Sequence, residues 1–197
     1  MAYHPLDINP KTPAKVNHFI HGHLDMLVHD IHCMLRLPMP ARGLRAGCNF
    51  AAATYLLDLI GGVSTALYWK GGRSGARFQD VLLKYYPWDM EPTGGLDAAT
   101  GSKTLYKIFR NPLVHALGLG KERIAIARSG LSERVLGKLE LSLTRPHAGS
   151  ARATIIEDPT DNRKHLLVDG LYWGFRRMVR RLTDDHELMA DVAKQLP

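Results

Sequence analysis

The stretch NHFIHGHLDMLVHDIHCMLRL, residues 17–37, decides the fold class, because its apolar side chains recur every three or four residues. Pro38 and Pro40 end this pattern, since proline cannot extend a helix interior. The stretch therefore predicts a long amphipathic helix that packs against other helices. Its buried face is expected to consist of Ile20, Leu24, Leu27, Ile31 and Met34 or Leu35.

Later segments carry the same helical signal. Residues 50–69 are largely apolar and predict a buried central helix, broken or bent at Gly61-Gly62. A short amphipathic helix is expected over residues 78–86, and another is expected to start near Ser102. The last helix is predicted from about His165 to Leu182. Its apolar stripe is formed by Val168, Leu171, Tyr172, Phe175, Met178, Val179 and Leu182.

The segment 50–69 is also about as long as a membrane span. Asp58 lies near its middle, and a carboxylate at the centre of a bilayer costs roughly 3 kcal/mol on insertion scales. Basic residues flank both ends of the segment, so they set no orientation across a membrane. We therefore expect a soluble bundle and no membrane partner.

Between Gly120 and Asp158 the pattern changes from helical spacing to alternation. Leu139, Leu141 and Leu143 alternate with polar residues, which is typical of a strand. Residues 153–156 are a candidate partner strand, joined by a turn over residues 145–151. The sequence thus predicts a mainly α fold, a helical bundle with a small β-hairpin insert around residues 121–157. One domain is expected over residues 1–197, with its core at about 17–183.

The composition is that of an ordinary globular protein. The 197 residues are 45% apolar and 23% charged, which excludes global disorder. A net charge of +7 is compatible with a polyanionic partner. The N-terminus has no basic segment followed by an apolar run, and two cysteines cannot build a disulfide framework. These features favour a cytoplasmic location.

A chemically suggestive segment is LYKIFRNPLVH, residues 105–115, which places a basic, a polar and a titratable side chain at Arg110, Asn111 and His115. This string resembles the signature of the HEPN superfamily (higher-eukaryote and prokaryote nucleotide-binding domain): arginine, a polar residue, and histidine a few positions later. The preceding helix that ends in Tyr86-Pro87 is also similar to HEPN relatives. The resemblance extends over about residues 50–183.

The HEPN resemblance implies a helical bundle that acts as a metal-independent endoribonuclease, often a toxin or defence effector. It also implies a homodimer in which the motifs of both chains meet in one cleft, with RNA or nucleotide as ligand and no cofactor. His115 would serve as general acid or base, and Arg110 would stabilise charge on the phosphorane oxygens. Asn111 would orient either group by hydrogen bonding.

Pro112 lies inside this motif and disfavours a helical conformation at Asn111. On an ideal helix the side chains of Arg110 and His115 would project about 140° apart. If Asn111 instead caps a new helix with Pro112 at its first position, the two side chains converge. The sequence leaves both arrangements open.

Two further groups of residues are candidate binding sites. Four arginines on the last helix form a basic patch that can neutralise phosphates: Arg176, Arg177, Arg180 and Arg181. The second group follows helical spacing on one face of the first helix and is a candidate metal site or a polar surface: His18, His21, Asp25, His29 and His32. Two alternatives to the ribonuclease follow. One is a non-catalytic bundle that binds nucleotide, RNA or an unidentified protein partner; the more distant one is a metal-dependent hydrolase.

Overall fold

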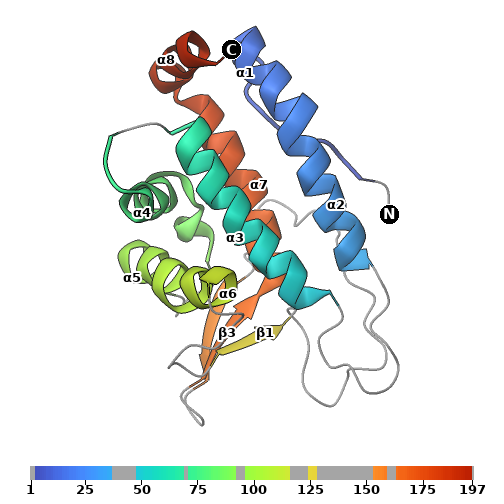
Figure 1. Ribbon diagram of the computed structural model, residues 1–197, viewed down its shortest axis with the longest axis vertical. Helices are drawn as coiled ribbons and strands as arrows, with labels where there is room; N and C mark the ends of the chain where they lie inside the picture. Colours follow the sequence, from blue (N-terminus) through green and yellow to red (C-terminus); the bar gives the residue numbers. More distant parts are fainter. Residues whose placement is uncertain are drawn as a thin grey trace.

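Helices dominate the computed structural model, as the periodicity predicts (Figure 1). The structure describes residues 3–36, 48–68, 71–91, 96–115, 124–127, 153–158 and 163–196. Among these residues, no helix has both the length and the apolar character needed to cross a membrane.

The first helical segment consists of α1 (Ala14–Phe19), the π-helical turn η1 (Ile20–Leu24) and α2 (Asp25–Arg36). It begins earlier than the apolar spacing indicates, since Val16 is also fully buried. Of the predicted apolar face, Leu27 and Met34 are only half-buried. The face that packs into the core consists of Val16, Ile20, Leu24, Val28, Ile31 and Leu35.

The central helix is α3 (Asn49–Ala66), which packs against α2, α4 (Ser74–Tyr85) and α7 (Val168–Asp184). It runs without interruption through Gly61-Gly62, so the predicted break there is wrong. Helical backbone hydrogen bonds and burial of the helix on several sides outweigh the low helix propensity of two glycines. The helix α4 ends before Pro87, as predicted, and the short 3-10 turn η2 (Trp88–Met90) follows.

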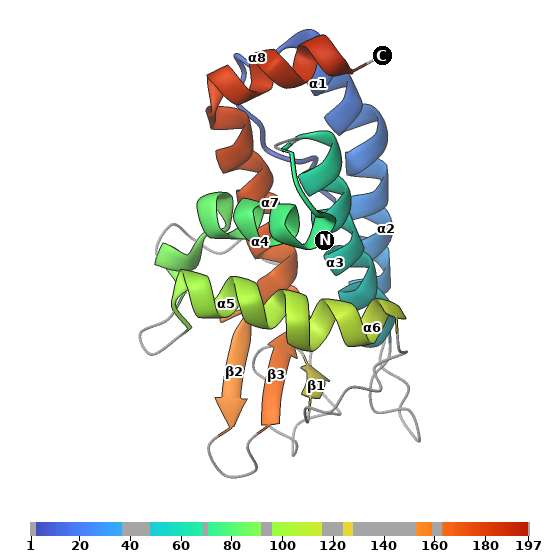
Figure 2. The same ribbon diagram turned by 60° about the vertical axis from the view of Figure 1, so that its left-hand side comes forward.

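A second continuous helical segment crosses the bundle below α4 (Figure 2). It comprises α5 (Ala98–Thr104), the π-helical turn η3 (Leu105–Arg110) and α6 (Asn111–His115). The segment starts at Ala98 because the Asp97 carboxylate caps it, accepting hydrogen bonds from the N–H groups of Ala99 and Thr100 at 3.0 Å each.

A three-stranded sheet lies at one end of the bundle (Figure 2). Its order is β1 (Ile124–Ala127), β3 (Arg163–Leu167) and β2 (Ile155–Asp158), with β1 parallel and β2 antiparallel to β3. Residues 163–167 therefore form a strand, whereas the sequence predicted that the last helix begins near His165. The predicted hairpin is not confirmed: residues 139–143 and 145–151 lie outside the described residues, and β2 pairs with β3.

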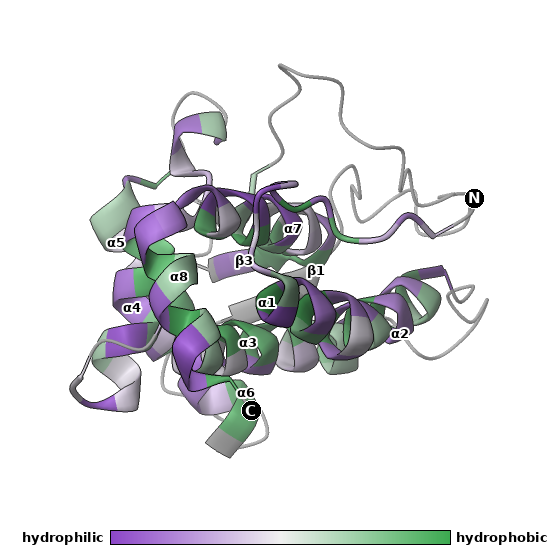
Figure 3. Cartoon of the chain, turned by 90° about the horizontal axis from the view of Figure 1, so that it is seen from above, coloured by the Kyte–Doolittle hydropathy of each residue, from purple (hydrophilic) through white to green (hydrophobic). Residues whose placement is uncertain are grey.

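The last two helices are α7 and α8 (His186–Gln195). The predicted apolar stripe of α7 is confirmed, since each of its members is buried against α3, α4 or the sheet. The helix α8 packs against α1 and α7. Figure 3 shows polar and apolar residues side by side around α2 and α8, the pattern of helices with one buried face.

Candidate nucleic-acid interface

The residues of the HEPN-like motif lie at the junction of η3 and α6. Arg110 is the last residue of η3, while Asn111 and His115 are the first and last residues of α6. For His115 only the backbone is described. Asn111 has φ −64° and ψ −49°, which is helical backbone. Of the two arrangements that the sequence left open, the structure has the continuous helix: Asn111 does not cap a new helix, and the helical segment continues through Pro112.

The π-helical turn explains how a proline fits inside this helix. Proline lacks an N–H, and its ring crowds the carbonyl four residues earlier. Directly before Pro112 the Asn111 N–H bonds to the Tyr106 carbonyl, five residues back rather than four. This wider turn lets the chain pass the proline without leaving helical geometry. Within one chain, Arg110 and the backbone of His115 therefore lie on one continuous helical segment.

Tyr106 holds the Arg110 side chain in place. The Arg110 guanidinium carbon lies 6.0 Å from the centre of the Tyr106 ring, within the range of a cation–π contact. The same ring packs against Phe78 of α4 with centroids 5.4 Å apart. A Cβ at Gly75 would lie 2.2 Å from the Tyr106 hydroxyl, so only glycine admits the ring at this place. Arg110 and Asn111 are both half-buried.

The segment 98–115 also carries cations that our sequence reasoning missed. Lys103 and Lys107 are exposed and make no ion pair with any described residue. The available signal was the absence of any Asp or Glu between residues 98 and 115, in a stretch containing two lysines and an arginine. All formal charges that the segment itself contributes are therefore positive.

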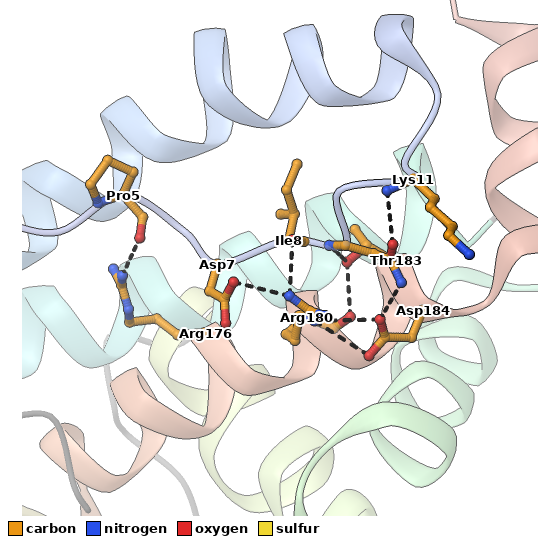
Figure 4. Close-up of polar contacts among 9 residues, drawn as sticks. Pro5, Asp7, Ile8, Lys11, Arg176, Arg180, Thr183 and Asp184 are labelled. Carbon is orange, nitrogen blue, oxygen red and sulfur yellow. Dashed lines mark hydrogen bonds and ion pairs between the residues drawn. The ribbon is translucent and has the colours of Figure 1, made fainter.

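Arg176 and Arg180 of α7, two of the predicted phosphate-binding arginines, hold an N-terminal strap, residues 3–12 (Figure 4). Arg176 donates to the carbonyls of His4 and Pro5 at 2.6 and 2.7 Å. Arg180 donates to the Asp7 carboxylate and the Ile8 carbonyl, both at 3.0 Å. These contacts fix the strap along α7.

The other two arginines of α7 contact the turn after α4. Arg181 forms a bidentate pair with Asp89 at 2.7 and 2.9 Å, and these hydrogen bonds hold the pKa of Asp89 below its ordinary value. Arg177 places its Nη1 3.3 Å from the sulfur of Met90. The arginine patch thus stabilises the fold through contacts within the chain.

The histidine-rich set of the first helix does not form one exposed face. The structure buries Asp25 and His32 to 7% and 5% exposure, while His18, His21 and His29 are exposed. The π-helical turn η1 changes the periodicity that the prediction assumed. Among the described residues, no three His, Cys, Asp or Glu side chains are placed to hold a metal ion.

Asp25 serves as an anchor for the strap. Its Oδ1 accepts hydrogen bonds from the Tyr3 hydroxyl and the Leu6 N–H, each at 2.7 Å, while its Oδ2 lies 2.5 Å from His21 Nδ1. Burial and the neighbouring Asp25 carboxylate raise the pKa of Tyr3. His32 contacts the Tyr172 hydroxyl through Nδ1 at 3.3 Å. Both carboxylate oxygens of Asp25 are thus occupied by contacts within the chain, which stabilise the fold.

A small cavity of about 10 Å³ lies where β2 meets α7 and the turn after α4. Glu91 reaches into this region and binds Thr154, accepting from its N–H at 2.9 Å and from its hydroxyl at 2.5 Å. Tyr86 contacts the same hydroxyl at 2.6 Å. Desolvation by burial raises the pKa of Glu91. The cavity has room for about one water molecule, which is too little for a substrate.

The segment 98–115 thus combines exposed lysines with the motif residues. In comparisons with known proteins, no family model, no curated protein and no solved structure matches this chain.

Proposed function

We propose that this chain is a metal-independent endoribonuclease that uses the 2′-hydroxyl of its RNA substrate as nucleophile. The observation that carries the proposal is the exposed helical segment 98–115, which holds Arg110, Asn111 and the backbone of His115 and contains no carboxylate. Its own cations attract the phosphates of RNA, and no acidic side chain of the same segment opposes them. The HEPN-like motif supplies the residue types for cleavage.

His115 is proposed to remove the 2′-hydroxyl proton or to protonate the leaving 5′-oxygen, since an imidazole ordinarily titrates near neutral pH. The 2′-oxygen forms a bond to phosphorus while the bond from phosphorus to the 5′-oxygen breaks. The products are a 2′,3′-cyclic phosphate and a free 5′-hydroxyl. Arg110 stabilises the charge that accumulates on the phosphorane oxygens. Asn111 orients the phosphate by hydrogen bonding.

The helical backbone through Pro112 affects whether Arg110 and His115 of one chain can form a single active site. The motif lies on continuous helical backbone, and residues five apart on an ideal α-helix project about 140° apart. We therefore propose that the active site is shared by two copies. In a two-fold dimer, Arg110 of one copy approaches His115 of the other. If the protein is instead a monomer, the same geometry favours the alternative of a non-catalytic module that binds RNA or nucleotide.

Cleavage of a mixed RNA pool in EDTA tests the proposal. We expect products that end in a 2′,3′-cyclic phosphate and no cleavage of 2′-deoxy substrates. His115→Ala should lower the rate by about 10² to 10⁴ and Arg110→Ala by about 10² or more. The Arg110→Lys variant should cleave little faster than Arg110→Ala, because a lysine lacks the planar fork of donors.

His186 is a matched control, because it is exposed at the start of α8 and its Ala variant should cleave at the wild-type rate. Absence of cleavage, or cleavage that survives His115→Ala, would overturn the ribonuclease proposal. Binding of the same RNA without cleavage would then favour the non-catalytic module.

A further inference from the structure

The basic side chains of two described segments differ in their contacts. On α7, Arg176, Arg180 and Arg181 each donate to carbonyls or carboxylates of the same chain. On the segment 98–115, Lys103 and Lys107 are exposed and form no ion pair with the part of the chain that the structure describes. Between these two groups, it is Lys103 and Lys107 that can bind an external anion without first breaking such ion pairs.

The spacing places four side chains along one surface of α5 and η3. Lys103, Tyr106, Lys107 and Arg110 follow each other by three, one and three residues, and all four are exposed or half-buried. By contrast, Leu105 and Phe109 of the same segment are fully buried. From Lys103 to Arg110 the helix rises about 10 Å, at 1.5 Å per residue. A stacked strand covers this length with about three nucleotides, at 3.4 Å each.

Tyr106 distinguishes this surface from a general cationic patch. Its ring lies among the cations and is fixed by Phe78 and by the Arg110 guanidinium. A rigid aromatic ring between cations is what proteins use to stack a base while neighbouring side chains bind phosphates. The large apolar side chains that are exposed among the described residues are Met26, Phe50, Tyr55 and Leu83, and none belongs to this segment. The surface therefore lacks the apolar area that a membrane or a protein partner would use.

We propose that Lys103, Tyr106, Lys107 and Arg110 form a binding track for single-stranded RNA, in which the cations hold successive phosphates and Tyr106 stacks a base. The track leads to Asn111 and α6, so it would deliver the strand to the proposed cleavage site. This inference rests on the proposed function in naming RNA as the ligand, but it concerns binding and can be tested separately from cleavage.

The test is fluorescence anisotropy with a labelled 2′-O-methyl RNA of about 15 nucleotides, which the 2′-hydroxyl mechanism cannot cleave. Lys103→Glu/Lys107→Glu should weaken binding about tenfold or more. It should also reduce the salt dependence, by about 0.7 in the slope of log K against log salt for each lost phosphate contact. The matched control is Lys11→Glu/Lys15→Glu, which changes the net charge equally. Lys15 lies in α1 and Lys11 precedes this helix. Both are exposed, with Lys15 donating to the Leu196 carbonyl at 3.2 Å, and their variant should keep most of the affinity.

Circular dichroism melting should show all variants folded, since the four lysines are exposed. Wild-type affinity in Lys103→Glu/Lys107→Glu, an equal loss in the control, or no RNA binding by the wild type would each overturn the track. Binding to anionic phosphatidylserine vesicles without binding to RNA would do so as well.

Cleavage of ordinary RNA, measured in parallel, separates the two proposals. Tight binding that depends on Lys103 and Lys107, without cleavage, supports the track and rejects the ribonuclease. Cleavage of ordinary RNA by a protein whose RNA binding does not depend on Lys103 and Lys107 supports the ribonuclease and rejects the track.

Discussion

Asp25 is the residue on which most contacts of the N-terminal strap with α2 converge. Asp25→Asn keeps an oxygen that can accept from Tyr3 and Leu6, but it replaces the charged acceptor by a neutral one and sets an NH₂ group against His21 Nδ1. We expect a loss of about 1 to 3 kcal/mol in the free energy of unfolding, because hydrogen bonds to a charged acceptor are the stronger ones. Urea denaturation measures this loss. Asp30→Asn, at an exposed position of the same helix, should change stability by less than about 0.5 kcal/mol.

Asp185, between α7 and α8, gives the fold a defined acid sensitivity. Hydrogen bonds from the Tyr85 hydroxyl at 2.6 Å and from Lys84 at 2.9 Å lower the pKa of Asp185 to about 2. Because the folded pKa lies below the ordinary 3.8, this stabilisation is complete above about pH 4 and is lost as the pH falls toward 2.

Asp185→Asn should therefore destabilise the protein by about 1 kcal/mol at pH 7, the figure being reduced for screening by water around this partly exposed side chain. Asparagine still caps α8, so the variant isolates the effect of charge. Denaturation at several pH values should show the difference from wild type shrinking toward pH 2. A difference that does not change between pH 7 and pH 2 would contradict this explanation.

Single residues also show where sequence reasoning fails. Arg176 and Arg180 follow the spacing of an exposed basic surface, and nothing local reveals that the strap covers them, because their partners lie about 170 residues away in sequence. The same holds for Lys103 and Lys107, whose lack of ion pairs depends on which elements pack nearby. Charge pattern alone therefore does not show which basic side chains are engaged within the fold.

At the scale of elements, two glycines in helices should respond in opposite ways to alanine. A Cβ at Gly174 of α7 would lie 2.0 Å from the Tyr86 hydroxyl, whereas a Cβ at Gly61 of α3 meets nothing within 4 Å. Gly174→Ala should cost about 1 to 3 kcal/mol through overpacking. Gly61→Ala should stabilise by about 0.5 to 1 kcal/mol, through helix propensity. Thermal denaturation of both variants checks the pair, and a destabilised Gly61→Ala would contradict the structure of α3.

The helices were predictable because their signal is local. Three-four spacing reports directly which side of a helix is buried. The structure confirms it for every predicted residue of 168–182, and in the first helix for Ile20, Leu24, Ile31 and Leu35 but not for Leu27. The strand β3 was missed for the opposite reason: one partner, β1, lies about 40 residues earlier, and pairing across that distance leaves no local periodicity. The turn η3 was equally hidden, since a π-helical hydrogen bond differs from an α-helical one by a single residue.

At the scale of the whole molecule, the shared active site requires a homodimer. We expect light scattering at micromolar concentration to give about 44 kDa, twice the chain mass of 22.0 kDa. Mixing inactive Arg110→Ala with inactive His115→Ala should then restore part of the activity, because half of the mixed sites of a heterodimer keep both groups. A mass of about 22 kDa at all concentrations would contradict the shared site.

The strap has a consequence for the order in which the chain folds during synthesis. Its contacts with Asp25 span only 19 to 22 residues, so they can form early. Its contacts with Arg176, Thr183 and Asp184 span 171 to 175 residues. At 5 to 20 residues per second, these partners emerge from the ribosome roughly 10 to 35 s later. For that interval the strap of the nascent chain is tied to α2 alone, and the backbone groups of His4, Pro5 and Asn9 that bind α7 are left to water or to a chaperone.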